Sequence, residues 1–326
     1  MTKRLLSWLL ATVLLATASN AEAQQTKKLP RLGILTFNIS RAAIDMDAFF
    51  QELRRLGWVE GQTIAFEFRT AEGIADRLPG LASELVQLKV DAILASSTPP
   101  ALAAQKATST IPIVFNLVAD PVGSGLVASL AWPGGNITGL ANLNTELAGK
   151  RLELLKEAFP KVSRVAVLSN PADPISSPQL KNLDIVAPAL GIKLQRFEVR
   201  DPKDFDLVVS ALTKARPGAL FVVTSQMFAG ERKRIVEMAA KIRLPTIFWN
   251  SVMVDAGGLM SYGTNVADLN RRAAVYVDKI LKGTKPADLP VEQPMRFEFV
   301  INLKTAKQIG VTIPPNVLVR ANRVIR

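Results

Sequence analysis

The chain has 326 residues, a formal net charge of +12, and neither histidine nor cysteine. The missing histidine excludes a Ser-His-Asp triad, histidine acid-base catalysis and histidine metal sites, and the missing cysteine excludes disulfides. Basic residues are dispersed and aromatic residues make up only 6% of the chain, so we expect no nucleic-acid partner. We also expect no metal and no cofactor, while hydrolysis by a pair of carboxylates remains open.

The first 23 residues have the pattern of a secretory signal peptide. Lys3 and Arg4 precede a short apolar stretch, residues 5–16, and the small-x-small site Ala21-Glu22-Ala23 follows it. Cleavage after Ala23 would leave a mature chain that begins at Gln24. Because no lipobox cysteine could carry a lipid anchor, we expect an unanchored periplasmic protein, with secretion into the medium as the alternative.

The mature chain begins with alternating strand and helix patterns. Strands are expected at 32–37, 64–68 and 91–95, and helices at about 49–57 and 76–88. This rhythm predicts βαβ units and therefore a parallel α/β sheet. In open sheets of this class, small ligands bind outside the carboxyl ends of the strands.

Two of the expected strands end in polar loops that open helices. Ser96, Ser97 and Thr98 precede two prolines, and Asp120-Pro121 follows the next apolar run. Hydroxyls and carboxylates cap helices, and a helix N-terminus also attracts an anion. Because one cap needs one hydroxyl and three are present, we interpret Ser97 and Thr98 as ligand-binding residues. Asp120 is explained equally well as a cap.

A turn cluster at residues 133–136 is followed by an expected strand at 137–140 and helix at 143–159. The same rhythm then restarts at residue 165, which predicts a second lobe. The further expected strands are 165–168, 192–199, 220–223, 246–248, 258–263 and 296–302, and the further helices are one that ends near 190, 205–215, 230–242, 265–281 and 303–309. The longest basic run, Arg232-Lys233-Arg234, falls on one of these helices, where we interpret it as solvated surface.

Six segments that span nearly the whole mature chain carry a family resemblance. They are GWVEGQTIAFEFR (57–69), LASELVQLKVDAILA (81–95), ATSTIPIVFNLVADPVGSGLVASLAWPGGNITG (107–139), LMSYGTN (259–265), ILKGTKPADLPVEQP (280–294) and FEFVINLKTAKQIGVTIPP (297–315). Together they resemble the ABC transporter substrate-binding family that includes tryptophan- and tyrosine-type binders. The resemblance implies a type I periplasmic binding protein: two Rossmann-like lobes with parallel sheets flanked by helices, and a hinge of three crossovers.

On this sequence the three implied crossovers fall near 140–145, 262–265 and 290–296. The first lobe would comprise residues 30–141 with about 263–295, and the second 142–262 with about 296–326. The implied function is capture of a solute between the lobes, without catalysis, and delivery to permease and ATPase subunits at the inner membrane by a monomeric protein. The alternative is an exported carboxylate-dependent hydrolase with the same two-lobe fold.

The resemblance also places ligand-binding residues on the loops at the strand ends. The positions matched are Thr36, Phe37, Asn38, Ser97, Thr98, Asp120, Asn142, Asn170, Thr224, Trp249, Asn250 and Ser251. Strand alternation favours a pocket position for Trp249 and a core position for Phe248. For Asn170, an Asx turn is the alternative.

One matched loop departs from the family pattern. In the amino-acid branch it supplies an acidic partner for the ligand's amino group, whereas residues 249–251 here are Trp-Asn-Ser. A buried ammonium without a charged partner is costly. We therefore expect a small carboxylate ligand: an amino acid, with Asp120 or Asp255 as the substitute partner, or an aromatic or aliphatic acid without an amine.

Overall fold

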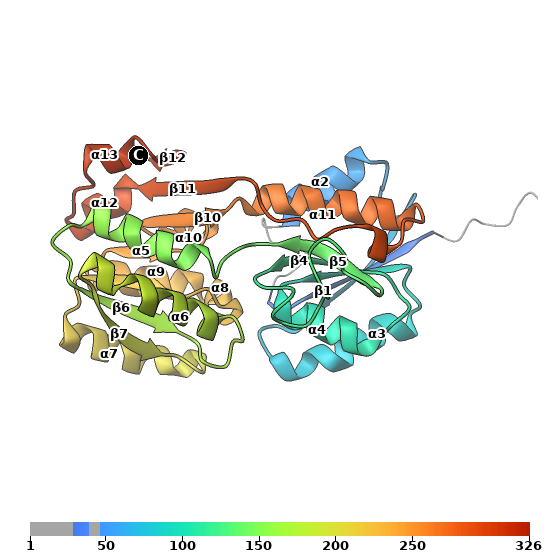
Figure 1. The fold of residues 1–326 in the computed structure, drawn as a ribbon, viewed down its shortest axis with the longest axis horizontal. Helices are drawn as coiled ribbons and strands as arrows, with labels where there is room; N and C mark the ends of the chain where they lie inside the picture. Colours follow the sequence, from blue (N-terminus) through green and yellow to red (C-terminus); the bar gives the residue numbers. More distant parts are fainter. Residues whose placement is uncertain (1–28, 39–45) are drawn as a thin grey trace, which may run out of the picture.

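The computed structural model describes residues 29–38 and 46–326, which form two α/β lobes side by side (Figure 1). Each lobe contains one sheet with helices packed on both of its faces. The expected signal peptide lies outside the described residues. Among the described helices, none has the length and apolar character needed to cross a membrane.

The first lobe is built on a five-stranded parallel sheet of order β2-β1-β3-β4-β5. Its strands are β1 (Arg31–Thr36), β2 (Ala65–Thr70), β3 (Ala92–Ser96), β4 (Ile113–Val118) and β5 (Ile137–Ala141). Strands β1, β3, β4 and β5 are short, largely buried runs, as expected for a sheet that helices cover on both faces, whereas the edge strand β2 is only half-buried. All five carboxyl ends therefore meet at one edge of the sheet.

Strand alternation divides the first lobe's core into two layers. Ile34 packs with α2 (Asp47–Arg55) and α11 (Val266–Leu281), whereas its neighbour Leu35 packs with α3 (Leu78–Gln87) and α4 (Thr98–Ala107). Successive side chains of a strand point to opposite faces, so each face carries its own apolar set. A short 3-10 turn, η3 (Ala75–Arg77), leads into α3.

The second lobe has a seven-stranded sheet of order β12-β11-β10-β9-β8-β6-β7. Its strands are β6 (Arg164–Ser169), β7 (Lys193–Glu198), β8 (Ala219–Val222), β9 (Thr246–Phe248), β10 (Met260–Thr264), β11 (Phe297–Asn302) and β12 (Arg323–Ile325). All neighbouring pairs are parallel except β10 with β11. That pair is antiparallel because β10 leads toward the first lobe and β11 returns from it.

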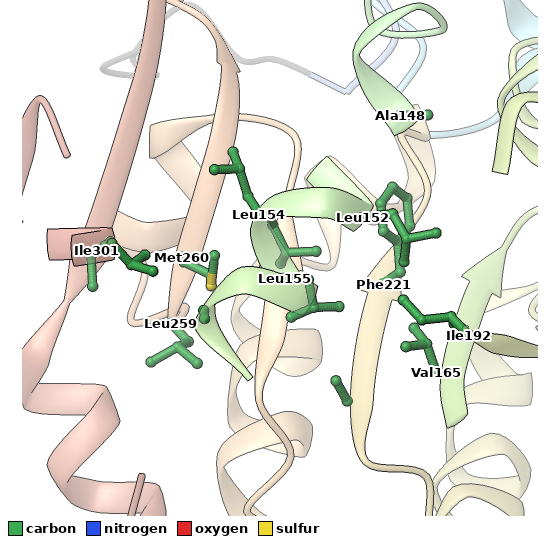
Figure 2. Packing of buried hydrophobic residues seen from close by; sticks show 14 of the residues in the cluster. Ala148, Leu152, Leu154, Leu155, Val165, Ile192, Phe221, Leu259, Met260 and Ile301 are labelled. Atoms are coloured by element: carbon green, nitrogen blue, oxygen red, sulfur yellow. The ribbon is translucent and has the colours of Figure 1, made fainter. Parts of the chain in front are cut away.

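The second lobe's helices enclose two further apolar layers. The helices are α5 (Leu147–Ala158), α6 (Ser176–Val186), α7 (Phe205–Ala215), α8 (Gln226–Gly230), α9 (Arg232–Lys241), α10 (Ser251–Asp255), α12 (Leu303–Ile309) and α13 (Pro315–Leu318). Two 3-10 turns, η4 (Pro188–Leu190) and η5 (Pro202–Asp204), belong to this lobe, and a third, η6 (Pro286–Asp288), lies against β5 of the first lobe. Figure 2 shows one layer, where Leu152 and Leu155 of α5 lie among Val165, Phe221 and Met260 from three strands.

Three helix boundaries differ from those expected from sequence. The helix expected from 143 begins only at Leu147, because Leu143 has a φ of 53°, in the left-handed region that an α-helix cannot include. The helix expected over 230–242 is α9, which begins at Arg232, and a separate short helix, α8, precedes it and ends before Glu231. Residues 251–255, where no helix was expected, form α10.

The chain passes between the two sheets three times, as expected (Figure 1). The first passage joins β5 to α5, and the second joins β10 to α11, which packs on the first lobe. The third runs from η6 to β11. These connections lie next to the carboxyl ends of β5 and β10, so they border the space between the lobes.

Candidate functional site

A cavity lies between the lobes at the carboxyl ends of strands from both sheets. It encloses about 910 Å³ between the atoms, part of it open to solvent. Its walls consist of Asn38, Leu117, Asn142, Asn144, Thr224, Gln226, Ala229, Arg232, Trp249, Asn250, Val252, Thr264 and Val266. Like typical small-molecule sites, it combines apolar walls with a few polar groups.

The first lobe contributes Asn38 and Leu117 to the cavity wall. Asn38 follows β1, and its Nδ2 donates to the carbonyl oxygen of Gln226 in the second lobe, 2.5 Å away. Leu117 sits at an irregularity in β4 with a φ of 59°, a conformation that is unfavourable for a branched side chain. One hydrogen bond therefore joins the two lobes at the cavity, and the first lobe's wall includes a strained backbone position.

The first two interlobe connections are bonded to each other at the cavity. Thr264 Oγ1 donates to the carbonyl oxygen of Asn142 at 2.6 Å. Asn142 Nδ2 donates to the Leu117 carbonyl oxygen at 2.8 Å, and Asn142 Oδ1 accepts from the Asn144 backbone N–H at 3.1 Å. The NH₂ group and the amide oxygen of Asn142 are thus both bonded within the connection. Asn144 is the other side-chain amide of this connection, and it can still form a hydrogen bond to a ligand.

The second lobe's wall is polar near the ends of β8 and β9. The hydroxyl oxygen of Thr224 and the Oδ1 atom of Asn250 are buried, and neither has a hydrogen-bond partner among the described residues. The backbone N–H of Gln226 donates to Asp173 Oδ2 at 3.1 Å, and burial raises the pKa of that carboxyl. Buried polar groups normally have partners, so the free Thr224 and Asn250 oxygens suit contact with a ligand.

Arg232 is the one charged side chain among the described residues that line the cavity. It is the first residue of α9, and its Nη1 donates to the Ala229 carbonyl oxygen at 3.1 Å. Our interpretation of the basic run as solvated surface is wrong for this residue, although Lys233 beside it is exposed. The break between α8 and α9 directs Arg232 to the cavity, and no helix periodicity in the sequence indicates it.

Five of the twelve expected site residues line the cavity: Asn38, Asn142, Thr224, Trp249 and Asn250. Trp249 is only 5% exposed and also packs on the second lobe's core, with Phe248 fully buried behind it. Thr36 lies within β1, Phe37 packs in the first lobe's core, and Ser251 begins α10. Those three positions are next to lining residues but outside the wall itself.

Ser97 and Thr98 lie behind the cavity wall and not in it. Ser97 has a φ of 83°, and its backbone N–H donates to the Asn116 carbonyl oxygen at 2.7 Å, one residue before the lining residue Leu117. Helix α4 begins at Thr98, and the Ser97 hydroxyl is buried without a partner in the described residues. Ser97 and Thr98 are therefore near the cavity, but lining residues such as Leu117 separate them from its surface.

The remaining expected residues have local structural roles. Asp120 is exposed, and its Oδ1 accepts from the Gly123 N–H at 2.7 Å, which closes a turn. Asn170 Oδ1 accepts from the Ala172 N–H at 3.0 Å in an Asx turn. Asp255 forms a two-point ion pair with Arg323 at 2.7 and 3.0 Å. Neither Asp120 nor Asp255 lines the cavity, so neither is placed to bind a ligand's amine there.

Comparison with known proteins gives consistent matches. Residues 39–325 match the family model described as ABC transporter substrate binding protein. A tyrosine-binding protein of Clostridioides difficile strain R20291 is 28% identical over 297 residues, which cover 90% of this chain and 85% of that protein.

Two solved structures are similar over nearly the whole fold. The ABC domain of Streptococcus pneumoniae in complex with L-Trp is 27% identical with a TM-score of 0.82, covering 91% of this chain and 100% of that one. The ligand-free, open structure of a Clostridium difficile substrate binding protein is also 27% identical but has a TM-score of 0.64, covering 91% and 99%. At the same identity, the present structure as a whole is thus more similar to the ligand-bound structure.

Proposed function

The chain belongs to the ABC transporter substrate-binding protein family, and from this premise we propose that it captures a small carboxylate between its lobes and delivers it to a membrane permease with its ATPase. In this proposal the protein is exported to the periplasm without a lipid anchor, acts as a monomer and performs no catalysis. The family is one of substrate-binding proteins, which supports the last point.

The observation that carries the carboxylate assignment is the position of Arg232 in the cavity wall. A guanidinium presents several N–H donors in a planar fork that matches a carboxylate, and Arg232 uses one of them on Ala229. Charge-assisted hydrogen bonds of this kind are stronger than neutral ones. Thr224 and Asn250 supply further polar atoms, and the Trp249 ring supplies an apolar surface for the body of the ligand.

The two similar proteins with named ligands bind tyrosine and L-Trp. These ligands support an aromatic amino acid as one form of the proposed carboxylate. The other form is an aromatic or aliphatic acid without an amine, which the Trp-Asn-Ser sequence at 249–251 favours. A matched set of ligands can distinguish these two forms, since only one of them requires a partner for an ammonium group.

We expect thermal unfolding to separate these ligands. The set is L-tyrosine, L-tryptophan, 3-(4-hydroxyphenyl)propionate, which is tyrosine without its amine, and the uncharged primary amide of that acid. A ligand at about 100 times its dissociation constant adds roughly 2.7 kcal/mol of stability. At least one carboxylate should raise the melting temperature by several degrees, and the amide should raise it far less. An amide as effective as its acid would contradict the carboxylate assignment, and turnover of the acid would contradict a binding function.

We further propose that the lobes close on the ligand by rotation about the three connections. The higher similarity to the ligand-bound relative than to the open one supports this movement. Since the chain has no cysteine, a spin-label pair is easily introduced at Ile74, after β2, and Leu207, in α7, both of which are exposed. Double electron–electron resonance should show shorter distances between the two spin labels when a carboxylate that stabilises the protein is added. An unchanged distribution at saturation would indicate a rigid cleft.

A further inference from the structure

Arg151, in α5, is the largest fully buried polar side chain in the described residues. Its Nε donates to the Tyr262 carbonyl oxygen at 2.8 Å. Its Nη2 donates to Asn144 twice, to Oδ1 at 2.7 Å and to the backbone oxygen at 3.2 Å. The guanidinium therefore holds the first interlobe connection, through Asn144, and the strand that leads into the second, through Tyr262.

The three acceptors of Arg151 are all uncharged oxygens. Arg151 forms no ion pair with any carboxylate in the described part of the chain, and one of its nitrogens, Nη1, has no partner there. Burial lowers the pKa of the guanidinium to about 9, and electrostatic interactions with Tyr262 and Glu146 partly oppose that effect. Arg151 is thus still cationic at neutral pH. A charge in the protein interior is screened less than one at the surface.

Asn144 connects this buried cation to the cavity. Its Oδ1 atom is directed to Arg151, so the NH₂ group is at the other end of the amide. The Asn144 side chain lines the cavity, and its Nδ2 donates to no atom of the described residues and is not among the buried atoms that lack a partner. The hydrogen bond from Arg151 therefore presents the two Asn144 donors to the cavity.

We propose that Arg151 is a positioning residue that gives this part of the cavity its preference for an anionic group. It does so in two ways: it fixes the Asn144 amide with its N–H donors toward the ligand, and it contributes a buried charge that forms no ion pair with a carboxylate of the described residues. The inference rests on the proposed function, because it specifies how the same cavity selects a carboxylate. Arg232 lines the same cavity, so the anionic group would be attracted by one cation directly and by a second through Asn144.

A purely structural role for Arg151 makes a different prediction. A brace between two connections needs only hydrogen-bond donors, and Thr264 and Asn142 already bond these segments to each other. If Arg151 were only a brace, its replacement would change the stability of the fold but would not matter through the electrostatic potential of the cavity. The two roles are separated by measuring that potential in the absence of any ligand.

A single cysteine can report the potential, because the chain contains no other. Thr264→Cys places a thiol in the cavity wall, two residues beyond the Tyr262 carbonyl that Arg151 binds. The pKa of this thiol is obtained from the pH dependence of its alkylation by iodoacetamide, followed by intact mass. A unit charge about 10 Å away, at an effective dielectric constant of about 20, changes a pKa by roughly one unit. Arg151→Met should therefore raise the thiol pKa by about one unit.

Three further variants make the result decisive. Arg151→Lys keeps the charge and should leave the thiol pKa within about 0.3 units of its starting value, a small fraction of the effect of a full charge. Arg151→Gln replaces Arg151→Met if the methionine variant does not fold. Arg196→Met removes an exposed cation that is paired with Asp184 and should have no effect. An unchanged thiol pKa in Arg151→Met or Arg151→Gln would overturn the inference.

The second readout uses ligand charge. In the chain without cysteine, Arg151→Met should weaken binding of 3-(4-hydroxyphenyl)propionate by about tenfold more than binding of its amide, and Arg151→Lys should restore most of the difference. Equal losses for acid and amide would show a brace only and would overturn the inference. If the thiol pKa rises as expected while no carboxylate in the set binds, the proposed function fails and the electrostatic role of Arg151 stands.

Discussion

Replacing Arg232 with methionine is expected to weaken carboxylate binding about 100-fold. Arg232 is the charged side chain in the cavity wall, and a hydrogen bond to a charged group is worth about 1.5–3 kcal/mol. The upper part of this range corresponds to about two powers of ten in the dissociation constant. Stability without ligand should change little, because the side chain makes only one hydrogen bond in the described structure, to Ala229. Titration calorimetry with 3-(4-hydroxyphenyl)propionate measures the affinity.

Lys233→Met is the matched control for this experiment. It removes the same charge one residue along α9, from an exposed side chain outside the cavity wall. We expect the affinity to fall by less than threefold, since an exposed charge outside the cavity is strongly screened by the solvent. Similar losses in the two variants would mean that the net positive charge of the chain attracts the ligand. No loss in either would show that the ligand is bound without a charged contact.

Local patterns in the sequence were sufficient to locate most elements of the fold. The bounds expected for 205–215, 246–248 and 303–309 coincide with α7, β9 and α12. These elements have a clear apolar period and unambiguous end signals. The antiparallel pairing of β10 with β11 was not predicted, because it depends on where the chain returns from the first lobe and not on the composition of either strand.

The site was predictable where it follows directly from the ends of strands. Thr224 and Trp249 follow β8 and β9 in the chain and line the cavity, as their positions indicate. Asn144 and Arg232 were missed, because the first depends on the left-handed turn at Leu143 and the second on the helix break at Glu231. The left-handed turn at Leu143 has no glycine or proline beside it, and the single Gly230 before Glu231 is compatible with an ordinary helix start.

A close backbone approach at Gly263 predicts a large effect on stability. Gly263 is in β10, between Tyr262 and the lining residue Thr264, and a Cβ atom there would lie 1.8 Å from the carbonyl oxygen of Trp249. That oxygen belongs to the backbone, so it cannot rotate away as a flexible side chain could. Gly263→Ala therefore forces β10 and the end of β9 apart. Overpacking in a well-packed region costs about 1–3 kcal/mol, and we expect a loss of about 3 kcal/mol.

Urea unfolding of Gly263→Ala and of Gly80→Ala tests this expectation. Gly80 is inside α3, with nothing within 4 Å of the position that a Cβ would take, so alanine there should stabilise the protein by about 0.5–1 kcal/mol. Gly263→Ala should also weaken ligand binding, because the displaced backbone carries Trp249, whose ring forms part of the cavity wall. If Gly263→Ala unfolds at the same urea concentration as the parent, β10 can shift without strain. The wall at Trp249 would then be adaptable, and ligand shape would be selected elsewhere in the cavity.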